Sequence, residues 1–169
     1  MNELFYHSPA THFCEALLLG NGRLGAILYG GVDEDVYKLN DDTLWSGYPR
    51  SYPQNGKETL NQVREALLND RVEEAHRLMD PLYGDPSQCY LPAGALTVRA
   101  AYGEAQRYRR SLSLEQALHE TVFDTAKDHH RRTAFSSYPD DVICIRYQSE
   151  HGLPPMEISL GIDLRHQIA

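Results

Sequence analysis

Gly20-Asn21-Gly22-Arg23-Leu24-Gly25 is the stretch of sequence that decides the fold class. One apolar run, 17–19, precedes it, and a second, 26–29, follows it before Gly30-Gly31. Asn-Gly is the strongest short-range signal for a β-hairpin, because both residues tolerate positive φ. The stretch therefore predicts two antiparallel strands joined by a tight turn.

The same six residues also match the G-x-G-x-x-G pattern of dinucleotide-binding loops, and Asp41 and Asp42 follow about twenty residues later. That chemistry needs the loop to open a helix whose N-terminal amides hold the pyrophosphate. Here the segment after the loop ends at two glycines and is too short for a helix, and no β-α-β rhythm follows. We therefore expect a structural turn and no cofactor.

Outward from this hairpin, the chain is mainly β. Short segments rich in β-branched and aromatic residues alternate with turn residues, as in an antiparallel sandwich. The expected strands are 36–40, 96–100, 108–114, 120–123, 133–135, 142–147 and 156–160. Residues 40–56 are expected to form a loop. The fold class is thus an antiparallel β-sandwich, supersandwich-like in arrangement.

A short two-helix insertion is expected near residues 57–80, with the two helices joined near Asn69-Asp70. Its apolar positions recur at helical spacing. They are Leu60, Val63, Leu67 and Leu68, and then Val72, Ala75, Leu78 and Met79. Capping boxes are expected at Asn55 with Glu58 and at Asp70 with Glu73. Pro81 and Gly84 are expected to end the helical region.

The composition is that of one soluble globular domain. The chain has 169 residues, 41% hydrophobic residues and a net charge of -8. An acidic chain argues against a nucleic-acid partner, and its apolar runs are far shorter than the roughly 20 residues of a membrane span. One basic group is expected to lie on solvated strand faces: Arg107, Arg109, Arg110, His129, His130, Arg131 and Arg132.

The cysteines and the first residues bear on the cellular compartment. Cys14, Cys89 and Cys144 are odd in number and have no CxxC spacing, so they are expected to be free and mostly buried. Met1-Asn2-Glu3-Leu4 lacks the pattern of a secretion signal. Both features favour a cytoplasmic protein.

Carboxylates and histidines give no clear catalytic or metal site. Adjacent carboxylates on a strand point to opposite faces, so they do not form a facing pair. The sets 33–35 and 140–141 are expected to be solvated turn residues, and Asp41 and Asp42 to serve structure or capping. The histidines lack metal-ligand spacing, so no metal site is expected. Trp45 is either a core or loop anchor, or a platform for a sugar ring or a second domain.

Several segments together resemble the opening of family 95 glycoside hydrolases. The first two are Glu15 to Ala26, containing Gly-Asn-Gly-Arg-Leu-Gly-Ala, and Leu39-Asn40-Asp41-Asp42-Thr43-Leu44-Trp45-Ser46-Gly47. In order along the chain follow 90–96, 108–114 and 131–142, with the stretch 57–79 matching a helical insertion of the family. The resemblance thus covers nearly the whole chain.

Some positions depart from the family pattern. Phe13 or a neighbour stands where the family has Trp, and Leu18 stands where it has Pro. Asp41, Leu91, Ala95 and Ser113 stand where it has Glu, Gln, Asp and Asp. These changes put in doubt any ligand contact made by those positions, but not the fold.

The resemblance implies an α-L-fucosidase-type enzyme that cleaves terminal α-L-fucosides, or related α-L-galactosides, with inversion. The family's Glu acid, and its Asn base activated by an Asp, belong to an (α/α)₆ barrel downstream. Residues 1–169 match none of those positions, so they are expected to be one incomplete N-terminal β-sandwich domain with no catalytic residues and no activity alone. The alternative is a stand-alone carbohydrate-binding or interaction module.

We expect five residues to lie next to the substrate or at a domain interface: Asn21, Arg23, Asn40, Asp42 and Trp45. The expected partners are the catalytic barrel of the same full-length chain and a carbohydrate substrate, with no nucleic acid and no membrane. Because missing strands would leave open sheet edges, we also expect the isolated chain to form a homodimer or to be marginally stable.

Overall fold

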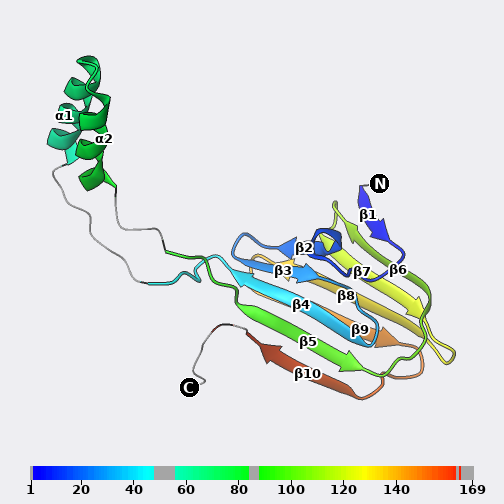
Figure 1. The fold of residues 1–169 in the computed structure, drawn as a ribbon. Coiled ribbons are helices and arrows are strands. Elements are labelled where there is room, and N and C mark those ends of the chain that lie inside the picture. The colour runs from blue at the N-terminus through cyan, green and yellow to red at the C-terminus, as the bar shows by residue number, and fades with distance from the viewer. Residues whose placement is uncertain (1, 48–55, 84–87, 163, 165–169) are drawn as a thin grey trace. The chain divides into compact units, whose positions relative to one another are not determined.

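The computed structural model of the chain describes residues 2–47, 56–83, 88–162 and 164 (Figure 1). Ten strands form two five-stranded antiparallel sheets. The first sheet has the order β1-β6-β7-β8-β9, and the second has the order β10-β5-β4-β3-β2. The strands are β1 Glu3–Tyr6, β2 Leu17–Gly20, β3 Leu24–Leu28, β4 Glu34–Asp41, β5 Gly94–Ala100, β6 Gln106–Ser113, β7 Leu118–Asp124, β8 His129–Ser137, β9 Val142–Ser149 and β10 Met156–Gly161.

The hairpin predicted at Asn21-Gly22 is confirmed. β2 and β3 pair antiparallel, with Leu17 opposite Leu28, and no helix follows the turn. Gly22 has φ of 95°, a left-handed conformation that favours glycine. The other predicted strands are also present, but β1 and a 3₁₀ turn, η1 Phe13–Glu15, were missed. The four residues of β1 are too few to display an alternation that distinguishes a strand.

The two sheets share one apolar core. Alternate residues of each strand face inward, as the period of a strand requires. The second sheet contributes Leu17, Leu19, Ala26, Leu28, Tyr37 and Val98, and the first contributes Leu112 and Ala134. Partly buried side chains of β9, including Ile143 and Ile145, pack against them. The sandwich architecture predicted from the sequence is therefore present.

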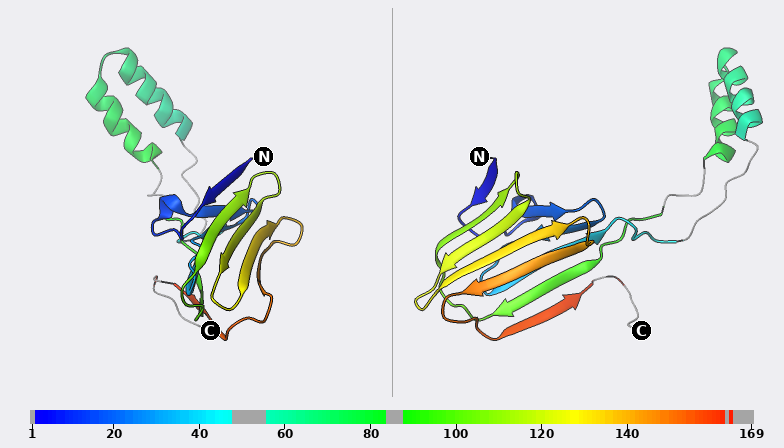
Figure 2. Two further views of the ribbon diagram at one scale, coloured as in Figure 1. Left: turned by 90° about the vertical axis from the view of Figure 1, so that its right-hand side faces the viewer. Right: turned by 180° about the vertical axis from the view of Figure 1, so that it is seen from behind.

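The sheets are offset from each other. Across the core, β9 approaches β3, while β7 and β8 approach β2. β10 is therefore the strand of the second sheet that lies furthest from the first sheet (Figures 1 and 2). On β10, Ile158 and Leu160 share a face with the core residues Val98 and Leu96, yet they are 66% and 70% exposed.

A buried ion pair joins the two sheets inside the core. Arg132 on β8 lies 3.1 Å from Asp35 on β4, and both side chains are almost fully buried. Asp35 also accepts a 2.5 Å hydrogen bond from the Tyr37 hydroxyl. The two terminal guanidinium nitrogens also donate to the carbonyl oxygens of Gly31 and Val32, in the turn before β4, while the buried Nε has no hydrogen-bond partner among the described residues. The pair thus holds this turn against the opposite sheet.

The electrostatics of this pair follow from its burial. Desolvation is the largest effect and lowers the pKa of Arg132, but Asp35 and the surrounding tyrosines Tyr147, Tyr102 and Tyr37 together outweigh it and leave the pKa raised. Desolvation raises the pKa of Asp35, and Arg132 and Tyr37 oppose that rise. We conclude that the charged pair is held together because either charge alone would be costly to bury.

The prediction of solvated basic strand faces is wrong for three residues. Arg110, His130 and Arg132 are buried. Arg110 donates to the carbonyl oxygens of Ser8 and Glu15, which lie in the segment between β1 and β2. Likewise, Asp35 was expected to be a solvated turn residue and is 2% exposed. Strand alternation places these side chains inward, where Arg110 pairs with backbone carbonyls, Arg132 with carbonyls and Asp35, and one ring nitrogen of His130 with the Thr125 hydroxyl.

The two-helix insertion is confirmed within a compact unit of its own, residues 45–90. α1 covers Gly56–Leu68, α2 covers Val72–Met79, and a 3₁₀ turn η2 covers Asp80–Leu82. The helices pack through Val63, Ala66 and Ala75. The predicted apolar face is wrong at four positions, which are exposed: Leu60, Leu67, Leu68 and Val72.

The two predicted helix caps have different outcomes. Arg71 is the N-cap of α2, and no side chain caps it, so the expected Asp70 cap is wrong. Asp70 instead has φ of 55° in the link between the helices, and a left-handed backbone there ends α1. Asn55, the other predicted cap, lies outside the described residues.

This unit leaves and re-enters the sandwich at neighbouring residues. Leu91 donates a 2.9 Å backbone hydrogen bond to Leu44, at the point where the chain returns. Strand β4 extends to Asp41, so the loop predicted at 40–56 begins two residues later than expected. In the part of the chain that the structure describes, no helix is long and apolar enough to cross a membrane.

The cysteines are free, as predicted, but they are not mostly buried. Cys14 and Cys89 are exposed, and Cys144 is half-buried. Cys14 lies in η1, which faces away from the core, and a small thiol needs no burial there.

Replacing Asp35 with Asn is expected to cost about 3–5 kcal/mol of unfolding free energy, because Arg132 keeps its charge and loses its counter-ion. The matched control is Glu34→Gln, which breaks an exposed 2.6 Å pair with Arg99 and should cost much less. Urea denaturation followed by circular dichroism measures both. Equal losses for the two variants would contradict a special role for the buried pair.

His119 predicts a pH dependence of stability. Desolvation, with a smaller contribution from Arg110, lowers the pKa of this buried side chain to about 4 from an ordinary 6.5. The unfolded chain therefore binds more protons between these values, and stability falls as pH drops from 7 toward 4. His119→Leu is expected to remove up to about 3 kcal/mol of that fall.

The control for this experiment is Leu112→Ala. Leu112 lies directly opposite His119 on β6 and is also buried. Its truncation should lower stability by the same amount at every pH, because no proton is involved. Unfolding free energies measured at several pH values separate the two variants, and parallel curves for both would refute the assignment to His119.

Candidate functional site

One end of the sandwich brings together three loops that are far apart in the sequence. They are the β2–β3 turn at Asn21, the end of β4 at Asp41 with Asp42 after it, and the β8–β9 turn that ends at Asp141. All three carry polar residues that are joined to one another by hydrogen bonds and ion pairs. We call this group the loop-end cluster, consisting of Asn21, Arg23, Asp41, Asp42 and Asp141.

Asn21 organises the cluster. Its side-chain oxygen accepts hydrogen bonds from the amides of Arg23, at 3.0 Å, and Leu24, at 2.7 Å, which closes the turn locally. Its side-chain nitrogen donates across to the Ser137 carbonyl at 2.9 Å and to Asp141 at 3.3 Å. One side chain thus uses both polar atoms to tie the second sheet to the first.

Arg23 presents a positioned positive charge. Its guanidinium lies 2.7 Å from Asp141 and 3.5 Å from Asp41, while its side chain is 55% exposed. The Arg23 carbonyl also accepts from the Asp42 amide at 3.1 Å. The arginine is therefore oriented by two carboxylates and still available to a ligand or to another protein surface.

Asp41 is held as an anion. Hydrogen bonds from the Thr43 hydroxyl and amide, followed in size by the Arg23 charge, lower its pKa. A general acid in glycoside hydrolysis needs a raised pKa. Among the described residues, the aspartate whose pKa is raised is Asp35, and it is buried in its ion pair. The loop-end cluster can accept and donate hydrogen bonds, but its geometry does not supply an acid.

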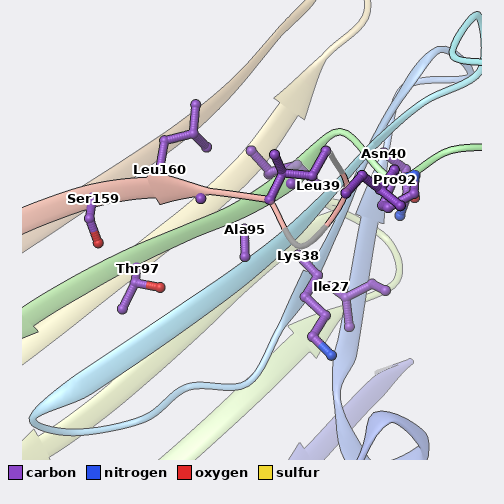
Figure 3. A pocket seen from close by; sticks show the side chains of 13 residues that line it. Ile27, Lys38, Leu39, Asn40, Pro92, Ala95, Thr97, Ser159 and Leu160 are labelled. Carbon is purple, nitrogen blue, oxygen red and sulfur yellow. The ribbon is translucent and has the colours of Figure 1, made fainter. Parts of the chain in front are cut away.

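Asn40 lies on β4 beside this cluster and borders two hollows. A cavity of about 360 Å³ is lined mostly by apolar side chains, including Leu39, Leu44 and Ile143. A larger groove of about 610 Å³ crosses β3, β4, β5 and β10 on the second sheet (Figure 3). In Figure 3, the side chains of Lys38 and Thr97 line the groove, and Asn40 lies at one end of the groove. The smaller hollow is mainly apolar, whereas polar side chains such as Lys38, Thr97 and Ser159 also line the groove.

Trp45 belongs to the unit of residues 45–90. Its ring packs edge-on against Tyr90 with centroids 5.4 Å apart, and it is 52% exposed. Backbone and side-chain hydrogen bonds between Ser46 and Cys89 fasten the two chain segments beside this pair. Trp45 is thus an exposed aromatic surface on a fixed base, which fits both a loop anchor and a platform.

Of the five residues predicted from sequence, the structure joins Asn21, Arg23 and Asp42 through the loop-end cluster and places Asn40 next to it. Asp41 and Asp141, expected to be structural or solvated, were missed as partners of Arg23. Asp141 is 118 residues from Arg23, and no local signal links such distant positions.

One group in the described residues has metal-ligand types close together: Asp128, Glu150 and His151. Asp128 accepts hydrogen bonds from the Ser149 hydroxyl and from the amides of Glu150 and His151. These bonds, led by that of Ser149, lower its pKa. Its oxygens thus close the turn after β9.

Comparison with known proteins decides the family. Residues 4–167 match the family described as "Glycosyl hydrolase family 65, N-terminal domain". The chain belongs to this family. The match covers both sheets and the helical unit, so the glycosyl hydrolase family 65 N-terminal domain accounts for nearly all of the described structure.

Relatives of this family 65 N-terminal domain include enzymes named as fucosidases. The chain is 33% identical over 171 residues to "Alpha-L-fucosidase 2" of Arabidopsis thaliana, covering 97% of the chain and 20% of that protein. It is 33% identical to "Probable alpha-fucosidase A" of Aspergillus niger, with 95% and 21% covered. It is 28% identical to the Aspergillus oryzae protein of the same name, a match that covers 85% of the chain and 21% of that protein. The chain spans about a fifth of the length of these relatives.

Asn21 is expected to contribute more than Arg23 to the stability of this domain. Asn21→Ala is expected to lower the unfolding free energy by about 1–2 kcal/mol, because partly buried partners on both sheets lose a hydrogen bond. Arg23→Met, which breaks an exposed pair, should lower it less. Thermal unfolding of the two variants beside the unchanged chain gives the comparison. A larger loss for Arg23→Met would mean that the arginine is mainly structural.

Proposed function

We propose that this chain is the non-catalytic N-terminal part of an α-L-fucosidase. The observation that carries the proposal is the 33% identity with "Alpha-L-fucosidase 2" across 97% of the chain but only 20% of that protein. Most of such a relative lies outside the matched region. We assign the hydrolytic residues to that remainder.

The motifs around Asn21 and Trp45 add to this proposal a family 95 type of reaction. In it, a terminal α-L-fucoside is cleaved with inversion by an (α/α)₆ barrel of the same full-length polypeptide. The number 95 rests on those motifs, since the matched family description carries the number 65.

The loop-end cluster supports the non-catalytic assignment. Inverting glycosidases need an acid and a base about 6.5–9.5 Å apart, with a proton held on the acid. Asp41 and Asp141 instead share Arg23, and hydrogen bonds lower the pKa of Asp41. Two aspartates that both neutralise one arginine can hold a contact in place, but they are not arranged for proton transfer. We assign the cluster to the contact with the catalytic part or with the substrate beside it.

Two further parts of the proposal concern the state of the chain. The isolated chain forms a homodimer, in keeping with its exposed apolar strand β10. The protein is cytoplasmic, in keeping with three free thiols, because paired cysteines persist in oxidising compartments. Cell fractionation followed by immunoblotting tests the location, and recovery in the medium or the periplasm would overturn it.

The activity test compares two polypeptides on an aryl α-L-fucoside. The 169-residue chain is expected to give no turnover, and the longest polypeptide that its gene encodes is expected to release the aryl group. Turnover by the chain alone would place the chemistry on the sandwich. Absence of turnover by both would overturn the assignment to an α-L-fucosidase.

A stand-alone carbohydrate-binding module is the second candidate, favoured by the exposed Trp45–Tyr90 pair. Aromatic faces are suited to the apolar side of a sugar ring. Titration of the chain with fucose or 2'-fucosyllactose, monitored by isothermal titration calorimetry, tests it, since this readout does not depend on the single tryptophan. Saturable binding that Trp45→Ala removes and Tyr138→Ala leaves unchanged would favour the module. Absence of binding would rule out the binding-module function.

A further inference from the structure

The Asn21-Gly22 sequence carries a chemistry that its role in the hairpin leaves unused. An asparagine side chain is open to attack by the amide nitrogen of the next residue, which makes asparagine thermolabile. Glycine in the second position favours the attack, because it has no Cβ to hinder the nitrogen and it reaches backbone angles closed to other residues. The chain has a second Asn-Gly sequence, Asn55-Gly56, in the unit of residues 45–90.

The reaction needs only water as a co-reactant. The Gly22 nitrogen forms a bond to Cγ of Asn21 and loses its proton, while the bond from Cγ to Nδ2 breaks and Nδ2 leaves as ammonia. The product is a five-membered imide in which the Gly22 nitrogen is bonded to both carbonyl carbons of Asn21. Water then cleaves one of these two carbon–nitrogen bonds. Cleavage at Cγ gives aspartate, and cleavage at the backbone carbon gives isoaspartate, so either product carries a new carboxylate.

The nucleophile of this reaction is unprotected. Gly22 is exposed, and within the described residues its amide donates no hydrogen bond. A Cβ added to Gly22 would meet nothing within 4 Å, so this side of the turn is open. Protection from the reaction must therefore come from the Asn21 side chain.

The Asn21 side chain is held at both ends. Its oxygen accepts from two backbone amides of its own turn, and its nitrogen donates to the Ser137 carbonyl and to Asp141. Attack requires the side-chain amide to rotate toward the Gly22 nitrogen, and it requires Nδ2 to take up a proton before it leaves. The four contacts oppose the rotation. A carbonyl and an ionised carboxylate are acceptors only, so Ser137 and Asp141 supply no proton to the leaving nitrogen.

We propose that Asn21 is a latent site of covalent modification controlled by the loop-end cluster. While the cluster is closed, the four contacts keep residue 21 an asparagine. When the cluster opens, the side chain is free to rotate and the imide forms. The carboxylate that results cannot donate to Ser137 and lies against Asp141, so the cluster cannot close again as before. The modification thus records in a covalent bond that this end of the sandwich has opened.

The reaction involves two adjacent residues and water, so it depends neither on a fucosidase activity nor on the remainder of a longer polypeptide. Absence of turnover on an aryl α-L-fucoside would leave the modification site untouched. Absence of modification would equally leave the enzyme assignment untouched.

The first test compares the rate of modification at Asn21 in the folded 169-residue chain and in the chain unfolded in guanidinium chloride. Peptide mapping by mass spectrometry measures aspartate and isoaspartate at each position. Modification at Asn21 is expected to be about tenfold slower or more in the folded chain, because each hydrogen bond that must break makes the reactive conformation several-fold rarer. Equal rates in the two states would overturn the proposal.

The second test asks whether the loop-end cluster is the source of the protection. Asp141→Ala removes one of the two acceptors of Nδ2 and should speed up modification of folded Asn21 by about threefold or more. The matched control is Glu34→Gln, which breaks an exposed ion pair at the other end of β4 and should leave the rate unchanged. Circular dichroism establishes that both variants are folded at the temperature of the experiment.

Asn55-Gly56 serves as a reference within each sample, and its rate should be the same in the unchanged chain and in both variants. An acceleration at Asn21 that Glu34→Gln shares, or that Asn55 shares, would assign the protection to overall stability and overturn the role of the cluster. An Asp141→Ala chain that is modified no faster than the unchanged chain would overturn it as well.

The third test examines the consequence of modification. Asn21→Asp replaces the Nδ2 donor with a carboxylate beside Asp141, and the thermal unfolding midpoint should fall below that of the unchanged chain. Adding Asp141→Asn exchanges the two side chains, places an amide donor opposite a carboxylate again, and should recover most of the loss. An Asn21→Asp chain as stable as the unchanged chain, or a loss that the exchange does not recover, would refute the claim that modification keeps the cluster from closing.

Discussion

The ion pair of Asp35 and Arg132 is the constraint on which the rest of the sandwich depends. It joins β4 of one sheet to β8 of the other through the middle of the core. Since a single buried charge is costly, neither residue can be placed without the other, and the relative position of the two sheets is fixed by a contact more specific than apolar packing. The hydroxyls of Tyr37 and Tyr147 donate hydrogen bonds to the Asp35 carboxylate and lie within hydrogen-bond distance of each other.

The loop-end cluster repeats this arrangement at the surface. Asn21 and Arg23 on one sheet meet Ser137 and Asp141 on the other, again by polar contacts across the sandwich. The difference is exposure. A buried charge is committed to its counter-ion, whereas Arg23 retains an exposed side chain that a sugar or a protein surface can reach. The same residue type is thus enclosed with its counter-ion at Arg132 and left accessible to solvent at Arg23.

The sequence predicted most of the fold and only part of the site. Strands such as 142–147 are recognisable because β-branched residues and flanking turns are local signals, and the Asn21-Gly22 hairpin is equally local. The ion pair was missed because Asp35 and Arg132 are 97 residues apart, and each has the ordinary appearance of a charged residue near a turn or on a strand. Asp141 was missed as a partner of Arg23 for the same reason. The helix face was predicted with errors in α1 because a small residue, Ala66, makes the contact rather than the larger Leu67 and Leu68, whereas Val63 and Ala75 were predicted correctly.

The hydrogen bond from Leu91 to Leu44 has a consequence for how this fold can vary. Residues 45–90 begin and end at adjacent points of the sandwich, so the frame of two sheets requires only that these two positions be bridged. The free energy of closing such a bridge changes slowly with its length. A segment of this kind can be lengthened, shortened or exchanged over generations of gene rearrangement without altering a single strand pairing. The helical pair is therefore the part of the domain most open to evolutionary replacement, and the sandwich is the part that must be inherited whole.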